Sequence, residues 1–543
     1  MSSDAEADTT SAESSAESAA DKRSLFSGLR IVSLCTLLSR VLGLIRDIGM
    51  ASLFGNGPIM DAFTVAFRAP NLLRRLFGEG ALTAAFLPAF VSDMEHNGRD
   101  SAWRLASSML WLLAVSLTSL VVGVELVLWL LRRTVDLGPD GNMLAGLMAV
   151  MLPYVVLICL AALVAAILHA LNHFTWPALI PVMLNVAWIA GIWLVAPFFE
   201  QPMQKVYAIS CAIVVGGMLQ LASPIPKLLK LGFRFDRQPK HEATNAKVKS
   251  VVRTMIPVLL GLSVTQFNSL LDSLIAWGLS APENPTVATG FAHPIESGTA
   301  SALYLGQRMY QFPLGVFGIA LGTVLFPLLA KNASQGRMDL VSKNLSMGLR
   351  LVIWIGIPAS VGLFLMATPL TDLLFRYNKF DANDARQTSA MIGAYGSAVW
   401  AYCALLILNR GFFAIGDQTT PMYVGFFAML SNLLINLILI WFIGGVGLAI
   451  GTAIVCSIQA FVVVGILDKK VGGLEWSSLV STAVKTLAAT LAMGIACHLT
   501  MNWIGPDAHR ATRLLGPVCA AIVIYIPASL LLGLNEWRSL LKK

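Results

Sequence analysis

Charged side chains, with one asparagine among them, interrupt two long apolar stretches near the start of the sequence. The residues are Arg40, Arg46 and Asp47 in the first stretch, and Asp61, Arg68, Asn71, Arg74, Arg75 and Glu79 in the second. Taking a charge out of water is costly unless the charge is paired or reaches solvent. These side chains therefore either form ion pairs inside the protein or line an aqueous cavity.

Helical spacing sorts these residues onto faces. Arg40 and Asp47 are seven residues apart and share one face, whereas Arg46 points roughly 120° away. In the second stretch a charged stripe follows one face, formed by Asp61, Arg68, Arg75 and Glu79. Pro70 can kink this helix and shift the phase of the stripe.

Arginine outnumbers carboxylate once later segments are included. Arg308 stands in LYLGQRMYQFP with no acid nearby in sequence, and further polar residues are Asn268, Asp272, Arg410 and Asp417. A cavity built from such segments has positive potential, and guanidinium groups bind phosphate and pyrophosphate oxygens through bidentate hydrogen bonds. The alternative is a set of salt bridges between helices with a purely structural role.

The sequence has no signature of catalysis or of cofactor binding. The seven histidines show no metal-ligand spacing, and no P-loop, nucleophile elbow or HExxH motif is present. The seven cysteines form neither a metal motif nor a disulfide framework. We therefore predict a transporter that is not an enzyme, that holds no metal or cofactor, and that is driven by a coupling ion or the membrane potential.

The segments that position these residues are typical of a membrane protein. Of 543 residues, 56% are hydrophobic and 13% are charged, whereas soluble domains are about 25% charged. Runs of about 20 apolar residues, enough to cross a bilayer as a helix, follow one another. The runs are too long for barrel strands, so the fold class is all-α integral membrane. The net charge of +8 lies in short loops, and no nucleic-acid partner is expected.

Hydropathy predicts about fourteen transmembrane helices. They lie near 28–54, 61–92, 104–131, 142–170, 176–198, 205–230, 248–279, 300–331, 345–369, 386–416, 420–442, 445–468, 477–503 and 512–534. We expect a disordered cytoplasmic tail (1–24), an N-terminal six-helix lobe (25–231), a cytoplasmic linker (232–247), a C-terminal six-helix lobe (248–470) and two last helices with a short tail (471–543).

The loops predict orientation, and two segments indicate a repeat. Lys and Arg concentrate after even-numbered helices, and loop 280–299 has neither, which places both termini in the cytoplasm. Arg132, Arg133, Arg376 and Lys379 are exceptions. The segments ALTAAFLP (81–88) and ALGTVLFP (320–327) each end about twenty residues after an arginine. Two lobes in parallel repeat, with a substrate site between them, are common in transporters; chance similarity is the alternative.

Four segments resemble one family. They are SRVLGLIRD (39–47), GNGPIMDAFTVAFRAPNLLRRLFGEGALTAAFLP (55–88), QRMYQFPLGVFGIALGTVLFP (307–327) and RGFFAIGDQTTP (410–421). These segments are similar to the MurJ/MviN lipid II flippases of the multidrug/oligosaccharidyl-lipid/polysaccharide exporter superfamily. The resemblance covers the first twelve helices and is strongest in the first, second and eighth.

The resemblance implies a carrier of the bacterial cytoplasmic (inner) membrane that moves lipid II, an undecaprenyl-pyrophosphate-linked muropeptide, from the inner to the outer leaflet by alternating access. It implies two pseudo-symmetric lobes around a V-shaped cavity, with a lipid-tail groove at the last two helices. It also implies that the substrate-binding residues are Arg40, Arg46, Arg74 and Arg308, and that the cavity or gating residues are Asp47, Asp61, Asn71, Arg75 and Glu79. The charged stripe favours Arg75, whereas the family favours Arg74.

The sequence departs from the family pattern in two places. Gln307 and Gln311 stand where many relatives carry acids, which makes the expected cavity more cationic, and loop 280–299 looks longer than usual. Related alternatives are an exporter of another polyprenyl-linked glycan or of drugs. From other classes, a polyprenyl-phosphate transferase would need clustered carboxylates at a membrane face, and a degenerate homologue would serve as a scaffold.

Overall fold

Every regular element in the described part of the chain is a helix. The computed structural model describes residues 31–235, 242–281 and 293–536, apart from the side chains of residues 78–81, 83–84, 242–243 and 260–265. Strand-like pairing within these residues is limited to one bridge between Ser280 and Ile295. The all-α prediction is confirmed. The predicted tail at 1–24 lies outside the described residues, as do parts of the linker and of loop 280–299.

Many of the described helices are long and apolar enough to cross a membrane. They number ten, or eleven when the bent pair Ala382–Gly396 and Val399–Ala414 is taken as one more span. The helical segments outside this set include residues 31–54, α2 (Pro58–Arg74), which has 17 residues, and α9 (Glu242–Gly278), in which the side chains of residues 260–265 are not described. The total of fourteen stays a prediction.

The chain forms two compact units. Unit 1 comprises Met1–Gly49 and Ala66–Ser263, and unit 2 comprises Met50–Val65 and Val264–Lys543. The units differ from the predicted lobes in their boundaries. The turn after the first helix belongs to unit 2, and the first part of α9 belongs to unit 1.

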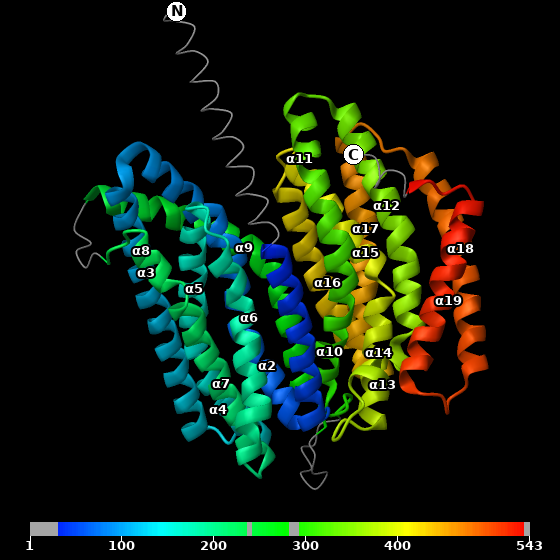
Figure 1. Cartoon of the computed structure of the whole chain (residues 1–543), viewed down its shortest axis with the longest axis horizontal. Coiled ribbons are helices and arrows are strands. Elements are labelled where there is room, and N and C mark those ends of the chain that lie inside the picture. The colour runs from blue at the N-terminus through cyan, green and yellow to red at the C-terminus, as the bar shows by residue number, and fades with distance from the viewer. Residues whose placement is uncertain (1–30, 236–241, 282–292, 537–543) are drawn as a thin grey trace, which may run out of the picture. The chain divides into compact units, whose positions relative to one another are not determined.

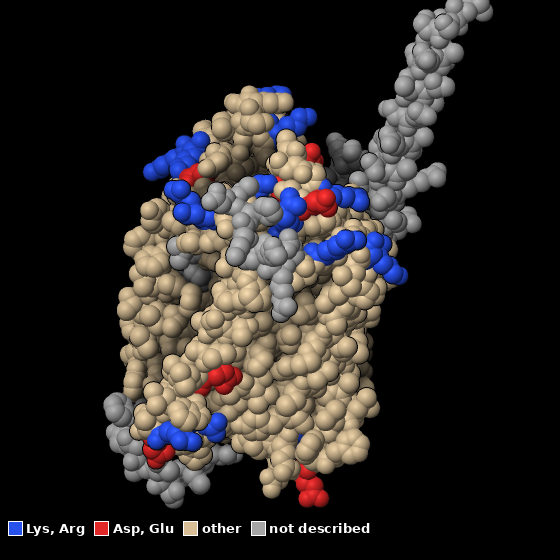
Figure 2. Space-filling view, turned by 90° about the vertical axis from the view of Figure 1, so that its left-hand side faces the viewer, with Lys and Arg blue, Asp and Glu red and all other residues tan. Residues whose placement is uncertain are grey.

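Unit 1 contains the helices from the first one to the first part of α9, apart from Met50–Val65. In chain order it contains the first helix up to Gly49, α2 from Ala66, the π-helix η1 (Arg75–Phe86), α3 (Leu87–Thr134), α4 (Gly138–Met151), α5 (Pro153–Ala170), α6 (Thr175–Ala190), η2 (Gly191–Val195), η3 (Ala196–Phe198), α7 (Pro202–Ala222), α8 (Ile225–Lys230) and α9 up to Ser263 (Figure 1). The bend in α3 lies at Gly98, whose φ of 79° is left-handed. The face in Figure 2 has few charged side chains across its middle and many at its rims, as contact with lipid requires.

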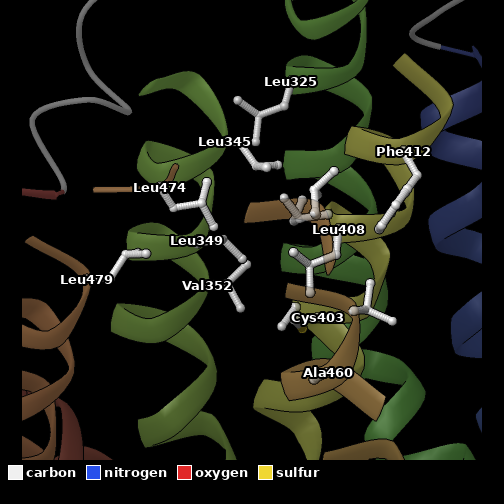
Figure 3. Packing of buried hydrophobic residues seen from close by; sticks show 14 of the residues in the cluster. Leu325, Leu345, Leu349, Val352, Cys403, Leu408, Phe412, Ala460, Leu474 and Leu479 are labelled. Carbon is white, nitrogen blue, oxygen red and sulfur yellow. The ribbon is translucent and has the colours of Figure 1, made fainter. Parts of the chain in front are cut away.

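Unit 2 contains Met50–Val65, α9 from Val264 and the helices that follow α9, which pack around an apolar core. They are α10 (Thr299–Pro313), the π-helix η4 (Leu314–Ile319), α11 (Ala320–Ser334), α12 (Met338–Leu365), α13 (Ala367–Leu374), α14 (Ala382–Gly396), α15 (Val399–Ala414), α16 (Thr419–Ile443), α17 (Val446–Lys470), α18 (Trp476–Ile504) and α19 (Arg510–Leu531) (Figure 1). Leu325, Leu345, Leu408 and Ala460 bring α11, α12, α15 and α17 together (Figure 3). α18 and α19 pack against each other, and α18 packs on α12.

Candidate functional site

Arg46 and Asp47 form a buried ion pair in unit 1. Nε and Nη2 of Arg46 donate to Oδ1 of Asp47 at 3.0 and 2.7 Å, and Nη1 donates to Oδ1 of Asn185 at 3.1 Å. The guanidinium also lies 4.0 Å from the ring centre of Trp188. Asn185 and Trp188 come from α6, so these contacts hold the first helix against α6. Helical spacing had placed Asp47 on the same face as Arg40, but the side chain of Arg46 is long enough for its guanidinium to reach Asp47.

The other predicted arginines of unit 1 have different surroundings. Arg40 is half-buried and forms no hydrogen bond or ion pair with any described residue. Nε of Arg74 donates to Oδ1 of Asn71 at 3.2 Å. Arg75 is half-buried at the start of η1. The side chain of Glu79 lies outside those that the structure describes.

Asp61 caps a helix of unit 2. Its Oδ2 accepts from the backbone N–H of Gly298 at 2.8 Å, and its Oδ1 accepts from the N–H and the hydroxyl of Ser301 at 2.7 and 2.8 Å. These groups stand at the N-terminus of α10, where a carboxylate is favoured by the unpaired N–H groups and the helix dipole. A residue of the second helix thus fixes the start of the helix that carries Arg308.

The turn before Asp61 docks on α14. The backbone N–H of Asn56 donates to Oδ2 of Asp384 at 3.0 Å, and its Nδ2 donates to Oγ1 of Thr388 at 2.8 Å. Gly55 has a φ of 65°, and a Cβ there would lie 2.8 Å from the carbonyl oxygen of Lys379. Only glycine combines this conformation with such a close approach. The Met50–Val65 segment is therefore shaped to fit unit 2.

Arg308 stands half-buried on α10. The preceding Gln307 is buried and its Nε2 donates to the hydroxyl of Tyr395 at 3.1 Å, so it takes part in packing α10 on α14. Gln311 is half-buried one turn after Arg308. Gln307, one of the two glutamines at positions where many relatives carry acids, is thus hydrogen-bonded to another residue of unit 2.

Unit 2 contains a buried polar cluster, of which the sequence analysis singled out only Asp272. Oδ1 of Asp272 on α9 accepts from Nδ2 of Asn436 at 2.8 Å, and the same Nδ2 lies 3.0 Å from Oδ1 of Asn432. Thr452 of α17 donates to Oδ2 of Asp272 at 3.4 Å. Asp272 was singled out from sequence, but its partners on α16 and α17 were missed. The available signal was the spacing of Asn432 and Asn436, four residues apart in an apolar helix.

Asp417 has a structural role outside the membrane-spanning helices. It accepts hydrogen bonds from Lys470 and from the backbone N–H groups of Thr419 and Thr420, which caps the start of α16. Although partial burial raises the pKa of Asp417, the hydrogen bonds from Lys470 and Thr420 outweigh this and hold it well below the usual value. The DQTTP segment thus forms a helix cap.

Comparison with known proteins decides the family. A family model described as lipid II flippase MurJ matches residues 50–505. The chain belongs to the MurJ family. A probable lipid II flippase MurJ of Vibrio cholerae serotype O1 is 34% identical over 539 residues, covering 95% of this chain and 97% of that protein. The lipid II flippase MurJ of Burkholderia cenocepacia is 32% identical over 514 residues, covering 92% and 95%.

Solved structures agree with MurJ membership at the level of the fold. A structure of lipid II flippase MurJ in an inward closed conformation aligns with a TM-score of 0.75 at 22% identity, covering 94% of this chain and 99% of that one. An inward-facing multidrug resistance MATE transporter aligns with a TM-score of 0.64 at 13% identity, covering 80% and 94%.

Membership of the MurJ family settles several predictions. The resemblance seen in the sequence is confirmed, and the relatives are named as flippases, which are transporters and not enzymes. With its membrane-capable helices, this MurJ homologue is a multi-pass protein of a bacterial inner membrane. The orientation of its termini stays a prediction.

Proposed function

We propose that this chain translocates lipid II from the inner to the outer leaflet of the cytoplasmic membrane for peptidoglycan synthesis. The observation that carries the proposal is the family match over residues 50–505, joined by relatives that are named lipid II flippases and align over nearly their whole length. A coupling ion or the membrane potential drives the cycle, because moving one charge through 100 mV is worth about 2.3 kcal/mol.

Three arginines bind the pyrophosphate in this proposal. Arg40 forms no hydrogen bond or ion pair with any described residue, and Arg74 contacts Asn71. Arg308 stands half-buried in an apolar helix segment. Guanidinium groups bind phosphate oxygens through charge-assisted hydrogen bonds. Because Arg46 is engaged by Asp47 and Trp188, it acts as a positioning residue for the first helix.

Alternating access gives the Met50–Val65 segment a role in gating. With both termini in the cytoplasm, this first turn lies on the outer side of the membrane. In this proposal its contacts through Asn56 and Asp61 belong to one state of the transport cycle. Opening of that side breaks them and releases the head group to the outer leaflet. Asp47, Asn71, Arg75 and Glu79 complete the proposed set of cavity and gating residues.

Depletion of the resident flippase from a bacterial host tests the proposal. We expect the wild-type chain to restore growth and to make lipid II accessible at the outer face. We expect Arg308→Ala to abolish both while the protein still reaches the membrane. Arg337→Ala, which removes an exposed arginine just before α12, is the matched control and should behave as wild type.

The same assay separates the related exporters. If growth fails and lipid II stays inaccessible although the wild-type protein is present in the membrane, the chain transports another polyprenyl-linked glycan or a drug. Normal growth of the Arg308→Ala variant would remove the anion-binding role of that residue but leave the transport proposal intact.

A further inference from the structure

Glu125 places a carboxylate at the lipid-facing side of α3. It is the only charged residue between Arg104 and Arg132, in the apolar stretch by which the second half of this helix crosses the membrane. The side chain of Glu125 is half-buried, whereas Val122 and Leu126 beside it are exposed. Figure 2 views the side of the molecule that carries α3, and acidic atoms interrupt its apolar belt. An ionisable side chain within a membrane span is costly and marks a functional site.

Two exposed tryptophans mark where this part of α3 enters and leaves the hydrocarbon. Trp111 and Trp129 are 54% and 51% exposed, and tryptophan is enriched at membrane–water interfaces. The helix rises about 27 Å between them, close to the hydrocarbon thickness of about 30 Å. Glu125 lies one turn before Trp129 and therefore about 6 Å deeper. Because helical side chains lean towards the N-terminus of their helix, the carboxylate leans towards the bilayer centre and away from the nearer interface.

No described residue of the chain neutralises Glu125. It forms no hydrogen bond or ion pair with any of them. Arg132 follows on the same face two turns later, but seven residues rise about 10 Å, which is too far for an ion pair. The guanidinium of Arg133 lies 4.4 Å from the ring centre of Trp129. The complement of the carboxylate must therefore come from outside the described part of the chain.

Glu125 also belongs to a stripe with the spacing of a helix–helix interface. Positions that alternate four and three residues apart stay on one face of a helix and form the contact line of paired helices. The members of this stripe are Trp111, Val115, Thr118, Val122, Glu125 and Trp129. All of them except the half-buried Glu125 are exposed. Lipid tails offer no partner to the polar members Thr118 and Glu125, whereas polar side chains of a neighbouring transmembrane helix do.

We propose that this stripe of α3 is the docking surface for a transmembrane helix of another membrane protein, which carries a lysine or arginine at the depth of Glu125. Opposite charge complements the carboxylate, and the attraction is strong where the dielectric constant is low. A second copy of this chain fits less well. Two copies in one membrane run in the same direction, so a two-fold contact through the stripe sets Glu125 against Glu125 at one depth, and like charges repel.

A synthetic transmembrane helix tests the proposal without knowledge of the natural partner. The probe is made of leucine and alanine, with one interfacial tryptophan and one lysine a turn deeper, and a second probe has leucine in place of lysine. Energy transfer from the donor-labelled full chain to each acceptor-labelled probe is measured in vesicles of phosphatidylcholine. We expect the lysine probe to associate and Glu125→Leu to weaken this association roughly tenfold, the size of one polar contact between helices in a membrane.

Two further variants of α3 serve as controls. Leu130→Ala changes an exposed residue about 100° round the helix from Trp129, and association should not change. Glu125→Gln keeps a hydrogen-bonding group without the charge and should lie between wild type and Glu125→Leu. The unfolding midpoint of Glu125→Leu should be equal to that of wild type or higher, because a carboxylate is removed from hydrocarbon.

Three results would overturn the proposal. Equal association of both probes would show that the lysine is not recognised, and equal association of wild type and Glu125→Leu would show the same for the carboxylate. A lower unfolding midpoint of Glu125→Leu would assign Glu125 to packing within the chain. Energy transfer between two labelled copies of the chain that Glu125→Leu abolishes would make the stripe a contact between copies instead.

Discussion

Arg46 and Arg40 of the first helix have different surroundings. We therefore expect loss of Arg46 to affect stability and loss of Arg40 to affect transport. Removing Arg46 leaves the buried Asp47 without its cation, and loss of one partner of a buried pair costs about 3–5 kcal/mol. We expect Arg46→Ala to lower the unfolding midpoint of the purified protein strongly. The double variant Arg46→Ala with Asp47→Ala should lose less than the sum of the single variants, because both buried charges are gone.

Arg40→Ala is the matched control in the same helix. Arg40 has no recorded partner among the described residues, so its loss should leave the midpoint nearly unchanged and abolish rescue of flippase-depleted cells. Thermal unfolding in detergent and growth measure the two effects separately. A fall in midpoint after Arg40→Ala as large as after Arg46→Ala would contradict this division of roles.

At the scale of elements, two segments of the chain have the same order of structure, a helix with a proline followed by a π-helix. The similarity of their sequences indicated this only weakly. α2 contains Pro70 and continues into the π-helix η1, and α10 ends at Pro313 and continues into the π-helix η4. π-helical turns are rare and frequently occur at functional sites. They also change the angle between successive side chains, so a wheel drawn at 3.6 residues per turn does not apply past Arg74.

The turn that joins the first helix to α2 gives a prediction for an element. In Gly55→Ala the new Cβ lies 2.7 Å from Oδ2 of Asp384 and 2.8 Å from the carbonyl oxygen of Lys379, at a left-handed φ of 65°. That conformation alone costs roughly 1–2 kcal/mol for an L residue. We expect the variant to unfold at lower temperature and to fail in complementation. Gly57→Ala is the control, since a Cβ there meets nothing within 4 Å; equal defects in both would exclude docking of the turn as the cause.

For the whole molecule, the sequence predicted what depends on composition and local spacing, and it missed what depends on distant partners. Long apolar runs were sufficient for an all-helical membrane protein. Asp61 was chosen as a buried acid, but its role as the cap of α10 depends on Ser301, 240 residues away. Asp47 pairs with Arg46 and not with Arg40, although Arg40 shares its helical face. This choice depends on Asn185 and Trp188 of α6, which contact Arg46 and which no helical wheel of the first helix contains.

A cross-link tests whether the molecule as a whole works by alternating access. Nδ2 of Asn378 donates to Oγ of Ser52 at 2.7 Å, so the two side chains are in contact. A disulfide between cysteines at these positions, Ser52→Cys with Asn378→Cys, would fix the Met50–Val65 segment on the rest of unit 2. Exposed Cys211 and Cys519 are first replaced by serine to avoid unwanted pairs. We expect oxidation to stop lipid II from reaching the outer face and reduction to restore it, because the turn must leave unit 2 once in each cycle. Each single-cysteine variant should be indifferent to oxidant. Transport that continues with the disulfide formed would mean that the turn stays docked throughout, and the outer side would then have to open elsewhere.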